Sequence, residues 1–386
     1  MFQICACSYG HPLVGVFPEA DSAEDQSLLG LLGLGAAAAA LADSSSSTTV
    51  LRYGYAANDG GDTISMHSVD DATGVFTALT PATVAAGGGT PRAMIKHPTA
   101  SFLYTANQTT DNISMFAIAS DGQLSALTPA TLATGGADPT EMAMSPDGLF
   151  GFIGYNTTSQ IDTYSVDAAT GQWSFLSSLS GCTVARELVF HPNGQYFYAL
   201  CSSGNQIRRH SYSSGVITHL GNTTGPGSQA NGLAITPDGL NLYATSQSST
   251  ALRMYSIDGS TGHLTTQTPP SKATDNWPAE VAIDAAGRYV FVNCWNAGAL
   301  SVRQYVIGSD GVLTDNTPTS IPTGGSQPIG MRVDPTGRYV YVGNGASDTI
   351  NMYSIDSDTG LLTSNGLLGT GNGVRAFAFV TETVVE

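Results

Sequence analysis

The stretch FLYTANQTTDNISMFAIASDGQLSALTPATLATGGADPTEMAMSPDGLF (residues 102–150) contains the unit from which most of this chain is copied. Short apolar runs alternate in it with polar turns such as Asp121-Gly122 and Pro146-Asp147-Gly148. Apolar runs of this length, bounded by Gly, Pro, Asn and Asp, are typical of β-strands joined by tight turns. We therefore expect four short strands in this unit, at residues 103–107, 113–116, 124–132 and 141–144.

The same unit recurs along the chain from Leu51 onward. In its second strand an apolar residue is followed three positions later by an aromatic ring, and a tight turn ending in Gly comes next. Gly is favoured there because a hairpin turn needs a positive φ. Each of these three positions, which we call columns, is found seven times along the chain, which predicts seven units. The columns are Ile64, Ile113, Ile161, Ile207, Leu252, Val302 and Ile350 for the apolar residue, His67, Phe116, Tyr164, His210, Tyr255, Tyr305 and Tyr353 for the ring, and Gly74, Gly122, Gly171, Gly215, Gly262, Gly311 and Gly360 for the turn.

The turns that connect one unit to the next predict how the ring closes. Such turns, for example Pro237-Asp238-Gly239, occur only six times, and the last strand at 374–380 has no hairpin partner after it. Its missing partner is the strand at 51–57, at the other end of the repeat. Pairing the two leaves no open sheet edge in the ring. The sequence therefore predicts an all-β, seven-bladed β-propeller, with the C-terminal strand innermost in the first blade.

Composition excludes some classes of partner. Charged residues make up 11% of the chain, and 13 Lys and Arg against 30 Asp and Glu give a formal net charge of −17. Nucleic acids are bound by clustered basic residues, and anionic membrane surfaces attract basic segments. We therefore expect neither as a partner. A surface this poor in Lys and built from Ser, Thr, Asn, Gln and Gly favours an extracellular or cell-surface protein.

The five cysteines are too few for a disulfide scaffold. Cys182 and Cys201 lie on either side of a strand-turn-strand segment centred on Asn193-Gly194, so they could face each other across the two strands. They are the candidate disulfide in an oxidising compartment. Two buried thiols are the alternative.

Residues 1–50 differ from the repeat that follows. The apolar run at 28–42 is shorter than the ~20 residues that span a bilayer, so we expect no membrane span. No Lys or Arg precedes Arg52, so the basic start of a signal peptide is missing. A degenerate targeting segment is the alternative. The predicted division is an N-terminal arm over residues 1–26, an apolar helix over 27–43, a Ser/Thr linker over 44–50 and the propeller over 51–386.

The N-terminal arm and its apolar helix have no place in a closed ring, which suggests a role in assembly. A strand of the arm could add to an exposed blade edge of a neighbouring copy, and a head-to-tail contact of this kind builds rings or filaments. We therefore expect a homo-oligomer or filament. The residues expected to make these contacts are Phe2, Cys5, Cys7, Val14, Leu28, Leu29, Leu31, Leu32 and Leu34.

The repeat resembles the lactonase family of seven-bladed propellers, which includes 6-phosphogluconolactonase-like and muconate-lactonising enzymes. The resemblance covers Leu51 to Glu386. It is carried by the Pro-Asp-Gly turns, by strand ends of the form Tyr-x-x-Asn, as at 104–107, and by hairpins of the form Thr-Gly-x-Leu, as at 261–264. It implies a propeller fold and lactone hydrolysis in the central channel.

The functional residues of that family are mostly replaced in this sequence. Where the family has a Pro-His pair the chain has Pro139-Thr140-Glu141, and of a Pro-Arg-His motif only Arg186 persists, within Ala185-Arg186-Glu187. A family acid falls on Cys201-Ser202, and an Asn-Arg-Gly motif on Ser246-Gln247. Lactone hydrolysis needs a positioned base and a clamp for the oxyanion. The replacements predict that the chemistry is lost.

These observations favour a non-catalytic extracellular structural or interaction propeller that self-assembles through its N-terminal arm. The first alternative is a divergent lactonase acting on a sugar lactone in the central channel. Arg186 and Glu187 are the candidate ligand-binding pair there, with an internal salt bridge between them as the other interpretation. The second alternative is an adhesin or ligand-binding propeller. No histidine pair has metal-ligand spacing, and we expect no metal or cofactor.

Overall fold

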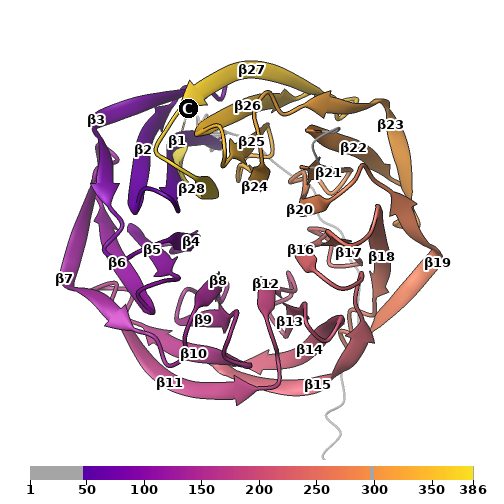
Figure 1. Ribbon diagram of the computed structural model, residues 1–386, viewed down its shortest axis with the longest axis horizontal. Coiled ribbons are helices and arrows are strands. Elements are labelled where there is room, and N and C mark those ends of the chain that lie inside the picture. Colours follow the sequence, from indigo (N-terminus) through magenta and orange to yellow (C-terminus); the bar gives the residue numbers. More distant parts are fainter. Residues whose placement is uncertain (1–46, 296–299, 386) are drawn as a thin grey trace, which may run out of the picture. The chain divides into compact units, whose positions relative to one another are not determined.

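The computed structural model describes residues 47–295 and 300–385. In this part of the chain 28 strands form seven four-stranded sheets, and every pairing is antiparallel. The sheets stand as blades around a central channel (Figure 1). The prediction of an all-β, seven-bladed propeller is confirmed. None of the described residues forms a helix long and apolar enough to cross a bilayer.

Each blade runs from an innermost strand at the channel to an outermost strand at the rim of the ring. Blade 1 contains β28 (Val374–Val385), β1 (Ser47–Asn58), β2 (Thr63–Val69) and β3 (Phe76–Ala85), in that order outward. Blade 2 contains β4 (Pro91–Lys96), β5 (Phe102–Asn107), β6 (Asn112–Ile118) and β7 (Leu124–Ala133). Blade 3 contains β8 (Pro139–Met144), β9 (Phe150–Tyr155), β10 (Gln160–Val166) and β11 (Trp173–Ser180).

The remaining blades repeat this order. Blade 4 contains β12 (Ala185–Phe190), β13 (Tyr196–Cys201), β14 (Gln206–Ser213) and β15 (Val216–Thr224). Blade 5 contains β16 (Ala230–Ile235), β17 (Asn241–Ser246), β18 (Ala251–Ile257) and β19 (Leu264–Ala273). Blade 6 contains β20 (Pro278–Ile283), β21 (Tyr289–Cys294), β22 (Ser301–Ile307) and β23 (Leu313–Pro322). Blade 7 contains β24 (Pro328–Val333), β25 (Tyr339–Asn344), β26 (Thr349–Ile355) and β27 (Leu362–Gly369).

Strands from both ends of the repeat close the ring in blade 1, as predicted. β28 pairs with β1 along its length, for example Tyr55 with Ala378. β1 begins at Ser47, four positions before the expected strand start at Leu51, and residues 47–50 pair with 382–385. Thr and Val in this segment have β-branched side chains that suit a strand. Part of the expected linker is therefore strand.

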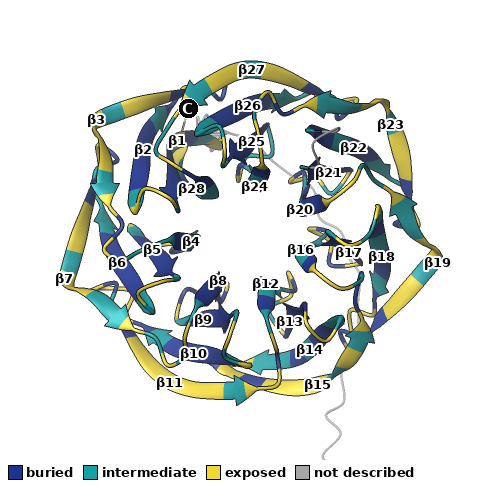
Figure 2. Ribbon diagram, viewed as in Figure 1, coloured by how far each residue is buried: buried dark blue, intermediate teal, exposed yellow. Residues whose placement is uncertain are grey.

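The core lies between the blades, where the second and third strands face their neighbours. These strands are largely buried, whereas the outermost strands are largely exposed (Figure 2). Buried tyrosines tie neighbouring blades together: the Tyr341 hydroxyl donates to the Gly74 carbonyl at 2.8 Å. Gly74 has a φ of +70°, and a Cβ there would lie 2.3 Å from the Tyr339 ring. The glycine column of the sequence thus reflects both turn geometry and close packing between blades.

The N-terminal predictions lie outside the described residues. The arm over 1–26, the apolar helix over 27–43 and the start of the linker belong to residues 1–46. The same holds for the nine residues expected to make assembly contacts, so the expected arm and its assembly role stay predictions.

A disulfide joins Cys182 and Cys201 in blade 4. Their Cα atoms are 5.2 Å apart, and 19 positions separate them in the sequence. Cys182 precedes β12 and Cys201 ends β13, so the bond ties the start of an innermost strand to its neighbour. Cys294, at the end of β21, is a buried free thiol.

Candidate active site in the central channel

A bulge at the start of every innermost strand aims side chains at the channel. In β4 the pairing with β5 slips between Pro91 and Ala93, which leaves Arg92 without a partner in the ladder. The same slip occurs at the second residue of β12 and of β28, which are Arg186 and Arg375. Bulges commonly redirect a side chain beside an active site. Blades 1, 2 and 4 thus each contribute one arginine through the same kind of bulge.

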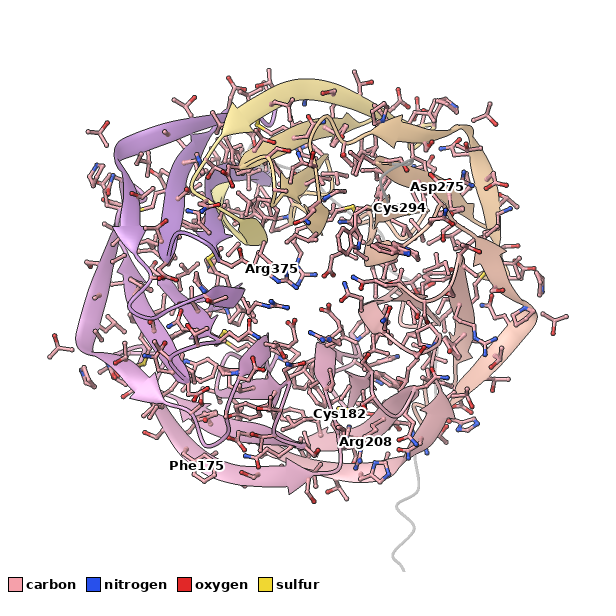
Figure 3. The ribbon with its side chains drawn as sticks, in the orientation of Figure 1. Phe175, Cys182, Arg208, Asp275, Cys294 and Arg375 are labelled. Atoms are coloured by element: carbon pink, nitrogen blue, oxygen red, sulfur yellow. A yellow bond between two sulfur atoms is a disulfide. The ribbon has the colours of Figure 1, made fainter. Side chains whose placement is uncertain are left out.

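These arginines line a small cavity of about 50 Å³ in the channel, together with Glu141 on β8 and Glu280 on β20. Arg375 extends from β28 into the central opening (Figure 3). A fourth arginine, Arg332 on β24, lines the same cavity. Thus four of the 13 basic residues of this acidic chain meet at one place. Such a concentration is typical of a site for an anion or a developing negative charge.

The arginines at this cavity are only partly compensated. Burial lowers the pKa of Arg92 to about 9, and the nearby charges of Arg375 and Arg186 lower it further. Burial also lowers the pKa of Arg186 and of Arg375. Arg375 has Asp59 at 3.8 Å. Within the described residues Arg92 and Arg186 form no salt bridge. Their hydrogen-bonding groups are therefore open to a ligand.

Three carboxyl groups and Arg332 form a second group of charges in the channel. Burial raises the pKa of Glu141 to about 7, with Glu280 adding to the shift against the opposing effect of Arg332. Burial and the charge of Glu141 raise the pKa of Glu187 well above its usual range, and burial raises the pKa of Glu280. The three carboxyl groups in turn raise the pKa of Arg332. A carboxyl group whose pKa lies near 7 is suited to proton transfer at neutral pH.

The two mouths of the channel differ in chemistry. One is lined by methionines and phenylalanines, such as Met142 and Phe377, together with charged residues that include Glu187 and Arg332. The other is lined by amide side chains and Trp295, and it shares Arg92, Arg186 and Arg375 with the charged cavity. We call the second one the amide-lined mouth, because amide side chains line it and are absent from the described residues that line the first. Among residues 47–295 and 300–385, no three His, Cys, Asp or Glu side chains are grouped to hold a metal ion.

The structure separates the two residues that the sequence proposed as a pair. Arg186 faces the cavity beside Arg92, whereas Glu187 lies 3.7 Å from Arg332 of β24. The internal salt bridge expected between Arg186 and Glu187 is not among the ion pairs of the described residues. The ligand-binding role of each residue stays a prediction.

Sequence reasoning missed most residues of this site. Arg92, Arg375, Arg332, Glu141 and Glu280 all lie on innermost strands. Aligning the seven innermost strands would have placed Arg92, Arg186 and Arg375 in one column, and Glu141, Glu187 and Glu280 in the next. Glu141 lies in the stretch that replaces the Pro-His pair of the lactonase family, so the family's motifs give no signal for an acid at this position.

Comparisons with known proteins agree with this fold. The family described as lactonase, 7-bladed beta-propeller, matches residues 35–131, 100–181, 179–317 and 266–374. A 6-phosphogluconolactonase of Pectobacterium carotovorum subsp. carotovorum (strain PC1) is 26% identical over 212 residues, which are 51% of this chain and 60% of that protein. A 6-phosphogluconolactonase of Yersinia pestis (strain Pestoides F) is 24% identical over 39% of this chain and 46% of that protein. The matches thus span only part of these relatives.

Solved structures share the fold at low identity. The periplasmic gluconolactonase of Pseudomonas aeruginosa superposes with a TM-score of 0.71 at 16% identity, covering 86% of this chain and 99% of the other. A structure from Bacteroides uniformis ATCC 8492 superposes with a TM-score of 0.74 at 18% identity, covering 86% and 99%. The predicted resemblance to lactonase-type propellers is confirmed. The expectation of a non-catalytic structural propeller is wrong, because the curated relatives are named as lactonases. The error arose because loss of the family's motif residues was equated with loss of a charged site.

Proposed function

This chain belongs to the lactonase family of seven-bladed β-propellers, and from that premise we propose that it hydrolyses a sugar lactone in its central channel. The observation that carries the proposal is the convergence of Arg92, Arg186 and Arg375 with Glu141 on one channel cavity. Lactone hydrolysis converts a neutral ester into a carboxylate through an anionic tetrahedral intermediate. Arginines in excess over carboxyl groups can stabilise the anionic intermediate and bind the carboxylate product. A carboxyl group whose pKa is about 7 can transfer the proton.

Glu141 is the proposed general base. Above pH 7 its carboxylate accepts a proton from a water molecule while the water oxygen attacks the lactone carbonyl carbon. Burial gives this carboxyl group its pKa of about 7, so that it is a stronger base than an exposed Glu and still ionised at mildly alkaline pH. When the ring C–O bond breaks, the leaving alkoxide takes the proton back from Glu141. The product is a hydroxy acid, and the base is regenerated.

The arginines stabilise the negative charge. The carbonyl oxygen becomes an oxyanion as water adds, and a guanidinium donates hydrogen bonds to it in a site with little water. Arg92 and Arg186 have this capacity, since neither is paired with a carboxylate among the described residues. The same groups hold the product carboxylate or an anionic substituent of the substrate.

The test is a pH-stat assay of purified protein with glucono-δ-lactone and with its 6-phosphate, the latter chosen because relatives are named 6-phosphogluconolactonases. Glu141→Gln should lower kcat by about 100-fold or more. Arg186→Gln should lower kcat/KM by about 10- to 100-fold. Arg52→Gln is the matched control, because Arg52 pairs with Glu382 at an exposed position. Rates equal to spontaneous hydrolysis, or full activity of Glu141→Gln, would refute the proposal.

An extracellular or cell-surface location is also proposed. The disulfide between Cys182 and Cys201 supports it, because such bonds persist mainly in oxidising compartments. The acidic, Lys-poor composition points the same way. Cell fractionation with an antibody to the native protein would test it, and recovery with cytosolic markers would contradict it.

A further inference from the structure

The amide-lined mouth of the channel is built from a backbone feature that all seven blades share. The residue just before each innermost strand has a positive φ, for example +61° at Gln229, +57° at Trp277 and +52° at Gln327. Its carbonyl accepts a hydrogen bond from the backbone N–H of the residue that follows the second strand of the same blade, as Trp295 N–H does to Trp277 at 3.3 Å. Only blade 1 has glycine there, Gly373.

Six blades therefore keep a side chain where glycine would be free of strain. A left-handed conformation is unfavourable for a non-glycine residue. Strained residues of this kind gather where a side chain is needed at a site. The side chains that blades 5, 6 and 7 place at this mouth are neutral: Gln229 and Gln247, Trp277 and Trp295, and Gln327.

The two tryptophans form an aromatic wall beside the arginines. Trp295 lines a cavity of about 370 Å³ together with Arg92, Arg186 and Arg375. Trp277 packs against it with ring centroids 5.1 Å apart and an angle of 64° between the rings. Trp277 is 46% exposed, so this large side chain does not serve the core. It lies next to Trp295, outside the residues that line the cavity itself.

This mixture of groups matches one class of ligand. The face of an indole stacks on the C–H face of a pyranose ring, while an amide both accepts and donates hydrogen bonds to neighbouring hydroxyls. Gln229, Gln247 and Gln327 line the cavity with Trp295. The glutamines and Trp295 are uncharged groups suited to the hydroxyls and C–H faces of a sugar ring, and Arg92, Arg186 and Arg375 supply the positive charge of the same cavity. The mouth is continuous with the charged cavity, because both share three arginines and Asn231.

We propose that this mouth is a subsite for a glycosyl ring attached to the lactone, so that the substrate is the lactone of a disaccharide or a longer saccharide. The inference rests on the proposed lactonase activity for its reaction, but the subsite itself rests on the tryptophans and amides. The lactone ring occupies the cavity beside Glu141 and the arginines. The next sugar ring lies against Trp295 and Trp277.

The first experiment compares glucono-δ-lactone with cellobiono-δ-lactone as substrates. The wild type should have a kcat/KM about tenfold higher or more for the disaccharide lactone. Trp277→Gly should remove most of that preference and leave kcat/KM for the monosaccharide lactone within about twofold. Glycine adopts φ > 0 without strain, so this variant should fold as well as the wild type. Leu176→Ala is the control, because Leu176 is an exposed apolar residue on the outermost strand β11.

A second experiment separates the subsite from the reaction. Cellobiose, which has no lactone to hydrolyse, is titrated into the protein while tryptophan fluorescence is followed. Trp173 is buried, so a change reports on Trp277 and Trp295. Saturable binding that Trp277→Gly abolishes supports the subsite even if no lactone is hydrolysed, and then the proposed function alone fails. Lactone hydrolysis without disaccharide preference and without cellobiose binding would overturn the subsite and leave the lactonase standing.

Discussion

Arg332 on β24 and Glu187 on β12 form an ion pair across the central channel, with 3.7 Å between Nη2 and Oε1. The two strands belong to blades 7 and 4, which lie on different sides of the ring (Figure 1). Glu141 and Glu280 also act on the Arg332 guanidinium and raise its pKa. The 42% exposure of its side chain is to the channel that it lines. Arg332 thus acts on all three carboxyl groups in the middle of the propeller, and Arg375 acts on two of them, Glu141 and Glu280.

Removing this cation should destabilise the ring in a pH-dependent way. In Arg332→Met the three carboxyl groups lose their shared partner, so that ionising them in the folded state becomes costlier. We expect the free energy of unfolding, measured in urea, to fall by about 1–3 kcal/mol at pH 8. This range is lower than for a fully buried ion pair, because solvent in the channel screens the charges. At pH 5 the loss should be smaller, because the carboxyl groups are then mostly protonated.

The double variant Arg332→Met, Glu187→Gln is the control for this prediction. It removes one unpaired carboxylate, so part of the lost stability at pH 8 should return. If Arg332→Met lowered stability equally at pH 5 and pH 8, packing and not charge would explain the effect. The same would follow if the loss in the double variant equalled the sum of the losses in the two single variants.

The buried carboxyl groups also predict how the wild type responds to pH. The pKa of Glu141 in the folded protein is about 7, above its ordinary value of 4.5. A carboxyl group with a raised pKa favours the folded state while it is protonated, and this contribution is lost as the pH rises through 7. Unfolding free energy should therefore fall by about 1–2 kcal/mol between pH 5 and pH 8. In urea titrations, the unfolding free energy of Glu141→Gln should vary less between pH 5 and pH 8 than that of the wild type. Equal variation in the two proteins would contradict a raised pKa for Glu141.

The ring of blades could be predicted from the sequence because its determinants are local. Turn glycines such as Gly122 and aromatic residues such as Phe116 recur at fixed spacing, and this periodicity does not depend on tertiary contacts. The closure of the ring followed from counting, because the strand at 374–380 had no partner after it. The turn glycines and the aromatic residues each recur seven times, so single substitutions do not hide them.

The site could not be predicted in the same way. It depends on which residue of each innermost strand faces the channel, and on which strands lie opposite each other across the ring. Arg332 is the fifth residue of β24, whereas Glu187 is the third of β12. No sequence column joins them, and only the geometry of the channel brings them together. Likewise, the positive φ at Trp277 is invisible in the sequence, since tryptophan is not a residue that predicts a left-handed backbone.

The disulfide in blade 4 should stabilise the protein mainly by restricting the unfolded chain. With 19 positions between Cys182 and Cys201, replacing both by Ala should lower the free energy of unfolding by about 2–3 kcal/mol. The measurement is urea unfolding of the double variant beside the wild type, each with and without dithiothreitol. Reductant should destabilise only the wild type. Equal sensitivity of the two proteins would show that the bond is not the cause.

Closure by β28 should be required for a stable propeller. Truncation before Val374 removes the strand that pairs with β1 and also removes Phe377, which is 4% exposed in a core cluster with Tyr341. The exposed edge of β1 and the uncovered apolar face should then cause aggregation. Thermal unfolding and light scattering measure this outcome.

A shorter truncation after Val380 is the matched control for this prediction. It removes residues 381–386 but keeps the pairs from Tyr53↔Val380 to Asn58↔Val374 that line the channel side of blade 1. This variant should stay monodisperse, with a Tm only a few degrees lower, because the residues that it loses pair only with 47–51 at the far end of β1. If the longer truncation behaved like the shorter one, the remaining strands would close the ring alone, and the pairing of the two chain ends would not be what holds the blades together.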